Sequence, residues 1–358
     1  MSLKIIHCAD VHFDSAMSGV DPKKVNIRRE EMRKTFKKIT AMAENADILL
    51  IAGDLFDGQN VSASTLAFLK DEFSKIPDTK VYIIAGNHDY MGADCAYKTF
   101  DFGENVHIFP TEMECVEGTE FDIYGMSFKT ANDSREMLSG FKVKNPDKIN
   151  ICLMHANLGG TDYNPIKISD IESSRLDYLA LGHIHKATEI RQAGATFYAY
   201  CGCPEGRGKD ETGKKGVYAI ELIKGSVVSA DFVPVCERMY FDEEIDITDA
   251  TSYDEILEKI NEKYCGEQHI YRFTLTGKTN MAIDTEVIEE RIEGFSVTVR
   301  DKTTPAVDIE KLSGEFSLKG LFAKFALEEK SQMSEEDFTQ ALKAGLNYIE
   351  KEEKNENR

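Results

Sequence analysis

The sequence predicts an α/β protein followed by a smaller α+β domain. Over the first third of the chain, short apolar runs alternate with helical patterns in the order strand, helix, strand, helix, strand. Several of these runs end in Asp, Asn or His. After about residue 235, short strands alternate with strongly charged helices. We therefore expect a first domain over residues 1–235, an α+β cap domain over 236–301, and a linker with C-terminal helices over 302–358.

Composition sets limits on the class of protein. A chain of 358 residues with 42% hydrophobic and 30% charged residues is typical of a soluble globular protein with more than one domain. No apolar run of about 18 residues occurs, so we expect no membrane span. The first residues enter a strand pattern without the anatomy of a signal peptide, and the eight cysteines are scattered. These features favour a reduced, cytoplasmic protein, with Cys201 and Cys203 as a weak metal signal.

The net charge of −20 is unevenly distributed. Residues 234–358 carry 16 basic and 29 acidic side chains, a net charge of −13, and residues 1–233 carry a net charge of −7. This distribution argues against loose attraction of nucleic acid or anionic membrane over the whole surface. The distribution is still compatible with a local basic groove, or with a site whose negative charge is screened by metal ions.

The first predicted strand runs from Leu3 to Ala9 and delivers Asp10 and His12, whose i, i+2 spacing lets both point the same way. A helix is predicted over residues 22–45. Its buried stripe consists of Met32, Phe36, Ile39 and Ala43. Its basic outer face, which we expect to be solvated, consists of Lys23, Lys24, Arg28, Arg29, Arg33, Lys34, Lys37 and Lys38.

Further strands follow, each short and rich in β-branched residues. Residues 47–52 lead to Asp54, a helix covers 63–74, and residues 81–85 lead to Gly86 and Asn87. Residues 149–154 deliver His155, and residues 176–181 deliver His183 and His185. Antiparallel strands are predicted within 106–128 and over 188–191, 196–200, 216–222 and 226–233.

The second domain is predicted to contain strands at 239–247, 270–275 and 295–300. Ser252 and Glu255 form a capping-box pattern that opens a helix, and a second helix covers 284–292. Apolar helical stripes then appear at 316–327 and from Ser334 onward. Each stripe is compatible with either internal packing or a partner surface.

Five strands thus end in polar residues that we expect to converge, because ligands of α/β sheets gather beyond the carboxyl ends of strands. The alternative is a set of unrelated polar turns that bond their own backbone. The joint pattern favours a site. Its candidate members are Asp10, His12, Asp54, Asn87, His155, His183 and His185, with His88 beside them.

Carboxylate, amide and imidazole donors without thiolate suit Mn²⁺, Fe²⁺ or Zn²⁺. Seven ligands are too many for one ion with an open position but suffice for two ions that share a carboxylate. Two ions about 3.5–4 Å apart clamp a phosphate and generate hydroxide from a bridging water. We expect His88 to stabilise charge or protonate the leaving oxygen, Asp89 to orient His88, and Asp57 to brace a ligand.

The ordered motifs resemble those of calcineurin-like metallophosphoesterases. The motifs are Asp10-x-His12, Gly53-Asp54-x-x-Asp57, Gly86-Asn87-His88-Asp89, the lone His155 and Gly182-His183-x-His185. The resemblance implies a two-sheet α/β sandwich, often loaded with manganese. It also implies that Asp10, His12 and His185 hold one ion, that Asn87, His155 and His183 hold the other, and that Asp54 bridges them.

The flanking residues are similar to bacterial DNA-repair nucleases of the SbcD and YhaO type. The similarity lies in residues 7–14, the helix from Arg28, residues 200–207 and residues 312–322. It implies a Mn-dependent DNA exo/endonuclease whose cap contacts the DNA backbone without sequence preference. It also implies C-terminal helices that dock on an SbcC-like coiled-coil ATPase, and a homodimer. A small-nucleotide phosphodiesterase and a non-catalytic scaffold are the alternatives, and the intact ligand set argues against the scaffold.

Overall fold

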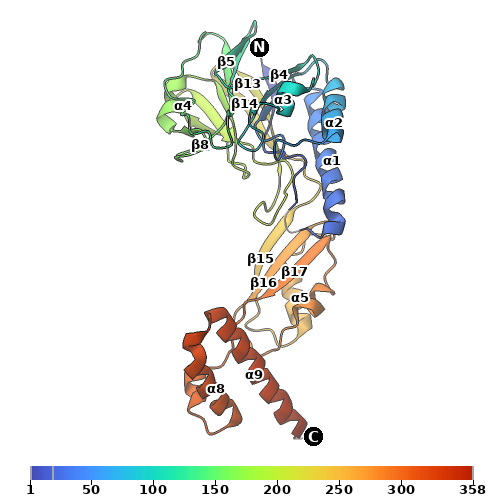
Figure 1. Cartoon of the computed structure of the whole chain (residues 1–358), viewed down its shortest axis with the longest axis vertical. Helices are drawn as coiled ribbons and strands as arrows, with labels where there is room; N and C mark the ends of the chain where they lie inside the picture. The colour runs from blue at the N-terminus through green and yellow to red at the C-terminus, as the bar shows by residue number, and fades with distance from the viewer. Residues whose placement is uncertain (1, 18–19, 357–358) are drawn as a thin grey trace. The chain divides into compact units, whose positions relative to one another are not determined.

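The computed structural model describes residues 2–17 and 20–356. The chain divides into two compact units, Met1–Met239 and Tyr240–Arg358 (Figure 1). The first unit contains two six-stranded sheets, and the predicted α/β class is confirmed. Among the described residues, no helix combines the length and the apolar character that a membrane span needs.

The first sheet has the strand order β14-β13-β1-β2-β3-β4. Strands β1 to β4 run parallel, and the hairpin of β13 and β14 adds antiparallel strands beside β1. The bounds are β1 Leu3–Cys8, β2 Ile48–Ala52, β3 Lys80–Ile84, β4 Val106–Ile108, β13 Gly216–Ile223 and β14 Ser226–Pro234.

The second sheet has the order β11-β12-β10-β7-β6-β5. Its bounds are β5 Glu114–Glu117, β6 Phe121–Gly125, β7 Ile149–His155, β10 Tyr178–Gly182, β11 Arg191–Ala193 and β12 Thr196–Tyr200. Between β7 and β10 lie the short strands β8 Asn157–Leu158 and β9 Pro165–Ile166 and the helix α4 Ile168–Ser174.

Three strands differ in part from the expected antiparallel arrangement. Strand β4 runs parallel to β3, β6 runs parallel to β7 while pairing antiparallel with β5, and β12 runs parallel to β10 while pairing antiparallel with β11. The hairpin of β11 and β12 is local, and its turn places Gly194 at φ 59°. The antiparallel pairing of β11 with β12 is as predicted. The long-range pairing of β12 with β10 leaves no local signature, which is why the sequence pattern did not reveal this parallel neighbour.

The apolar core lies between the two sheets. Leu50 and Ile84 of the first sheet and Leu153 and Ala180 of the second are fully buried members of one cluster. A second cluster, which includes Met154 and Leu181, covers the other side of the second sheet. Neighbouring residues of β7 and β10 therefore contribute to both clusters, as expected of a strand that is buried on both faces.

The helices α1 Val25–Ala43 and α2 Ala63–Ser74 lie side by side in the first unit (Figure 1). The Phe36 ring of α1 packs against Phe68 and Phe73 of α2. Ser62 caps α2 by accepting a hydrogen bond from Thr65 N–H. The short helices η1 Pro22–Lys24 and α3 Ala96–Thr99 complete this side.

The expectation that Arg28 lies on a solvated outer face is wrong. Arg28 is fully buried, and its guanidinium donates to Glu31 and, at 2.8 Å, to Glu205. The buried charge is stable there because two carboxylates pair with it. Glu205 lies 177 positions away in the sequence, so local helical periodicity could not reveal it.

The second unit begins with a parallel sheet, β15-β16-β17. Its elements are β15 Tyr240–Asp246, α5 Tyr253–Asn261, β16 Ile270–Thr276, α6 Thr285–Glu289 and β17 Ser296–Asp301. Ser252 accepts from Glu255 N–H at the start of α5, as the capping-box pattern predicts. Ile256 and Ile260 of α5 pack with Phe273 and Leu275 in a separate apolar cluster.

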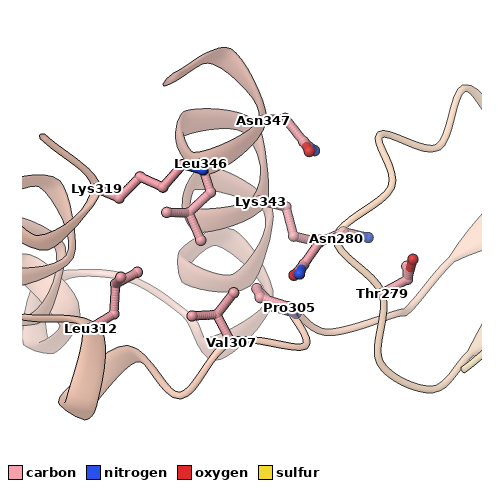
Figure 2. A pocket seen from close by; sticks show the side chains of 9 residues that line it. All are labelled: Thr279, Asn280, Pro305, Val307, Leu312, Lys319, Lys343, Leu346 and Asn347. Carbon is pink, nitrogen blue, oxygen red and sulfur yellow. The ribbon is translucent and has the colours of Figure 1, made fainter. Parts of the chain in front are cut away.

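The remaining helices of this unit are α7 Ile309–Ser313, α8 Leu318–Glu329, η2 Lys330–Gln332 and α9 Glu335–Glu356. The helix α7 lies inside the stretch expected to be a linker. Lys343 of α9 lies 2.6 Å from the Asp301 carboxylate and also donates to Thr303. A small pocket of about 80 Å³ lies beside these contacts, with Leu312, Lys319 and Leu346 facing Asn280 and Pro305 (Figure 2).

Candidate metal centre

All seven predicted ligands lie at one edge of the two sheets. Asp10 and His12 follow β1, Asp54 follows β2, and Asn87 follows β3. His155 ends β7, and His183 and His185 follow β10. Because β1, β2 and β3 are parallel to one another, as are β7 and β10, each sheet delivers its side chains at a single edge. The side chains meet between the sheets.

The backbone at the site is held in an unfavourable conformation. Asp10 has φ 53°, His12 φ 53°, Asp54 φ 51° and His183 φ 101°, which non-glycine residues rarely adopt. Hydrogen bonds between neighbouring loops hold this geometry: Asp10 N–H donates to Gly53 O at 3.0 Å, and His12 N–H donates to Asp54 O at 2.9 Å. Such strain is typical of functional sites, where the surrounding structure fixes the side-chain directions.

Gly182 permits the close approach of the two sheets at this edge. A Cβ atom at this position would lie 1.9 Å from the carbonyl oxygen of Ala52, which belongs to the other sheet. Any side chain here would therefore push β10 away from β2. The glycine places His183 next to the ligands that the first sheet supplies.

The ligand atoms form two groups with Asp54 between them. In the first group His12 Nε2 lies 3.3 Å from His185 Nε2, and His185 Nε2 lies 3.9 Å from Asp10 Oδ1. In the second group Asn87 Oδ1 lies 2.9 Å from His155 Nε2 and 3.2 Å from His183 Nδ1.

Asp54 Oδ2 lies 3.5 Å from an imidazole nitrogen of each group, His12 Nε2 and His155 Nε2. Among the residues that the structure describes, three overlapping clusters of potential metal ligands occur, and each brings its donor atoms within 4.8 Å of one another. The members are Asp10, His12 and His185 in one cluster, Asp10, Asp54 and His155 in another, and His12, Asp54 and His88 in the third.

The hydrogen bonds around the histidines fit a bound cation. His155 Nδ1 lies 3.1 Å from Ala52 O, and His12 Nδ1 lies 3.0 Å from Asp57 Oδ1, so both Nδ1 atoms carry the proton. The unprotonated Nε2 atom of His155 then faces Asn87 Oδ1 and Asp54 Oδ2, and that of His12 faces Asp54 Oδ2 and His185 Nε2. Lone pairs that face lone pairs repel, and a divalent cation between them removes the repulsion.

Burial keeps these imidazoles neutral, which is the form that binds metals. It lowers the pKa of His12 to about 4, that of His155 to about 3 and that of His183 to about 4. Burial also raises the pKa of Asp10 to about 7, and the nearby Asp54 carboxylate adds to this effect. A cation at the site favours the ionised form of Asp10.

His88 lies at the open side of the site, with 43% of its side chain exposed. Its Nδ1 lies 3.2 Å from Asp57 Oδ1, and its backbone N–H donates to Asp54 Oδ1 at 2.9 Å. The contact with Asp57 raises the pKa of His88, although partial burial opposes this. His88 can therefore hold a proton close to the Asp54 carboxylate.

The expectation that Asp89 orients His88 is wrong. Asp89 is buried, and its carboxylate accepts from Gly86 N–H at 2.7 Å, Phe56 N–H at 3.1 Å and Tyr97 OH at 2.5 Å. These donors tie the loop after β3 to the loop after β2. Adjacent residues in an irregular loop need not point the same way, so adjacency in the sequence was a poor guide.

Asp57, and not Asp89, makes the contact with the His88 ring. One of its oxygens, Oδ1, lies within hydrogen-bonding distance of His12 Nδ1, His88 Nδ1 and Arg207 Nη1, at 3.0, 3.2 and 3.3 Å. Burial alone would raise the pKa of Asp57, but the contacts with the two histidines outweigh it and the pKa is lowered. Asp57 therefore stays ionised and braces both His12 and His88.

Three residues to which the sequence assigns no role, Arg207, Glu211 and Asn164, contact the predicted site residues. Glu211 Oε1 lies 2.7 Å from His185 Nδ1, and Asn164 donates to His155 O at 3.1 Å. Residues 206–215 are rich in glycine and charge, which is the pattern of an exposed loop. Asn164 is a buried residue that no motif links to His155.

Comparisons with known proteins identify a family and several proteins to which this chain is similar. Residues 3–187 match the calcineurin-like phosphoesterase family. The chain is 30% identical over 281 residues to the uncharacterized metallophosphoesterase YhaO of Bacillus subtilis, and the aligned region covers 73% of this chain and 67% of that protein. It is 25% identical over 262 residues to the DNA double-strand break repair protein Mre11 of Methanopyrus kandleri, covering 65% of this chain but only 57% of that protein.

A third relative is the SbcD component of the SbcCD nuclease of Staphylococcus epidermidis. It is 22% identical over 319 residues, which cover 78% of this chain and 80% of that protein. The family match lies within the first unit, whereas the lengths of the aligned regions imply that the similarity to these relatives continues beyond residue 239.

Proposed function

The chain belongs to the calcineurin-like phosphoesterase family, and from that premise we propose that it is a nuclease that hydrolyses DNA phosphodiester bonds with two divalent ions. Membership of the family makes it a metal-dependent phosphoesterase. The observation that carries the proposal is the position of Asp54 Oδ2, 3.5 Å from His12 Nε2 and 3.5 Å from His155 Nε2, between two groups of ligands.

In this proposal Asp10, His12 and His185 would hold one ion, and Asn87, His155 and His183 would hold the other. Asp54 would be shared between the two ions. Bound there, the ions supply Lewis-acid activation of a water and offset phosphate charge. Oxygen and imidazole donors without thiolate suit Mn²⁺, Fe²⁺ or Zn²⁺. Among these we propose Mn²⁺, because the resemblance to the family implies it.

His88 acts on the leaving group. Its exposed ring can reach a phosphodiester at the open side of the site, and its proton passes to the oxygen that leaves phosphorus. Asp57 accepts from His88 Nδ1 and holds the ring in this orientation. Asp89 contributes by tying the loop that carries Asn87 and His88 to the loop that carries Asp54.

The names of the relatives support DNA as the substrate, because they include a double-strand break repair protein and a nuclease component. A net charge of −20 is unfavourable for wide contact with DNA. We therefore propose local, backbone-directed contact without base readout. A role in DNA repair in a reducing cytoplasm, where all eight cysteines stay free thiols, belongs to the same proposal.

The second unit offers a surface for a partner. Phe316, Leu318, Leu321 and Phe325 in and beside α8 expose from 50% to all of their surface, which is unusual for large apolar residues. We propose that these helices dock on an SbcC-like coiled-coil ATPase and that the nuclease acts as a homodimer. The division of the second unit into a cap and docking helices is part of this proposal.

The test is turnover by the metal-free chain reloaded with Mn²⁺. Linear DNA is offered in one reaction and cyclic or short nucleotides in another, with Asp54→Ala as the variant without the bridge. DNA cleavage that disappears in Asp54→Ala is the expected result. Turnover of small nucleotides alone would replace the nuclease with a small-nucleotide phosphodiesterase.

A further inference from the structure

One segment of the chain holds His185 by both its backbone and its side chain. The carbonyl oxygen of His185 accepts from Cys203 N–H at 3.3 Å and from Lys215 Nζ at 3.0 Å. Its Nδ1 lies 2.7 Å from Glu211 Oε1. Residues 203–215 therefore wrap around His185, the ligand that follows β10 by three positions.

Glu211 is fixed inside this segment rather than exposed. Its side chain is 10% exposed, its Oε2 accepts from Arg207 N–H at 2.6 Å, and its Oε1 pairs with Arg207 Nη2 at 2.7 Å. A buried carboxylate needs such partners to remain charged. Glu211 thus connects two parts of the same segment through its contacts with the backbone and the guanidinium of Arg207.

Arg207 connects Glu211 to the other side of the metal centre. Its Nη1 lies 3.3 Å from Asp57 Oδ1, and the same oxygen lies 3.0 Å from His12 Nδ1. One guanidinium therefore links the carboxylate beside His12 to the carboxylate beside His185. The Nε2 atoms of these two histidines face each other at 3.3 Å.

The segment is anchored immediately before Arg207. The carbonyl oxygen of Gly206 accepts from Arg28 Nη2 at 2.7 Å, and the Glu205 carboxylate pairs with the same guanidinium at 2.8 Å. Arg28 belongs to α1 and is fully buried. The position of Arg207 is therefore set by the body of the first unit.

We propose that Glu211 is a positioning residue for the ion held by Asp10, His12 and His185. Arg207 Nη2 lies 3.2 Å from His185 Nδ1, but Glu211 Oε1 is nearer and assigns the Nδ1 proton to a bond with the carboxylate. This leaves Nε2 unprotonated and aimed at the ion. Arg207 ties Glu211 to Asp57, so the two histidines are oriented as a pair. The inference rests on the two-ion function proposed above.

The experiment compares Mn²⁺ binding by the full chain and its Glu211→Gln variant, followed by calorimetry and by the electron paramagnetic resonance signal of a coupled Mn²⁺ pair. We expect one ion to bind about 10–100-fold more weakly and the other to be unchanged, so that the coupled signal is lost at subsaturating Mn²⁺. Glu72→Gln is the matched control. Glu72 is equally buried, accepts from Thr40 and Lys75, and belongs to α2, outside the metal centre.

Arg207→Lys provides a second variant, which keeps the charge but cannot bridge two carboxylates. This variant should weaken binding of the same ion by a smaller factor. If circular dichroism shows that Glu211→Gln does not fold, Arg207→Lys alone tests the proposal. Unchanged binding of both ions, or equal weakening of both, would overturn the proposal. A wild-type chain that binds only one ion would refute the two-ion function. The role of Glu211 would then be judged by whether Glu211→Gln binds that single ion more weakly than wild type does.

Discussion

At the scale of single residues, three histidines of the centre have contacts that fix where the imidazole carries its proton. Ala52 O accepts from His155, Asp57 accepts from His12, and Glu211 accepts from His185. The ligands themselves follow motifs that could be recognised in the sequence. Their supports could not, because a backbone carbonyl has no signature and Glu211 lies in a loop pattern.

Replacing His88 by alanine should separate chemistry from metal binding. We expect turnover to fall by about 10²–10⁴-fold because the proton donor is lost, while the number of bound ions stays at the wild-type value. The measurement pairs kcat with metal analysis of the same sample. His107→Ala is the control, since His107 is similarly exposed and contacts Glu114 instead. Loss of metal in His88→Ala would mean that His88 is a ligand.

A buried histidine outside the centre should make the protein acid-labile. Burial lowers the pKa of His7 to about 3, and its Nδ1 lies 2.9 Å from Tyr178 OH. Between its folded pKa and the unfolded value of about 6.5, only the unfolded chain takes up the proton, so stability falls as the pH falls. From pH 7 to pH 5 this loss is about 2 kcal/mol.

The His7→Gln variant keeps a polar partner for Tyr178 but does not titrate. Urea unfolding of both metal-free proteins at pH 7 and pH 5 should therefore show a smaller loss for the variant. An equal loss in both proteins would show that His7 does not carry this part of the pH dependence.

At the scale of elements, the strand ends were the most predictable feature. Buried strands such as β2 and β7 stand out in the sequence as short apolar runs, and parallel pairing brings their carboxyl ends to one edge. The contacts of Arg28 and the direction of β12 were not predictable, because both depend on partners far away in the sequence. The periodicity of apolar residues shows which face of a helix or strand is buried. It does not show whether a charged side chain pairs with a buried residue far away in the sequence.

The separation of the two sheets at the metal centre should depend on Gly182. In Gly182→Ala the added Cβ meets Ala52 O, and we expect a loss of about 1–3 kcal/mol in the free energy of unfolding together with weaker metal binding. Thermal unfolding and metal analysis measure the two effects. Gly314→Ala is the control, because its Cβ would meet only Lys311 O at 3.5 Å. Wild-type behaviour of Gly182→Ala would mean that the sheets tolerate a wider spacing here.

At the scale of the whole molecule, the candidate metal centre and most of the excess negative charge lie in different parts of the chain. All seven proposed ligands belong to the unit Met1–Met239, whereas residues 234–358 carry a net charge of −13. The exposed apolar side chains of α8 also belong to the second unit. In the function proposed above, hydrolysis takes place in the first unit and the second unit binds the partner.

A fragment of residues 1–239 should therefore keep the metal centre. We expect it to bind as many Mn²⁺ ions as the full chain and to hydrolyse a small diester such as bis-p-nitrophenyl phosphate, because the apolar core between its sheets is complete. The same fragment with Asp54→Ala is the inactive control. A folded fragment without metal would mean that the second unit contributes to the centre.

The most direct test of the account is to count and locate the bound ions. The full chain is loaded with Mn²⁺, the ions are counted by mass spectrometry, and their positions are found by anomalous diffraction. The account predicts two ions per chain, about 3.5–4 Å apart, with the Asp54 carboxylate between them. A single ion, or two ions that do not share Asp54, would contradict it.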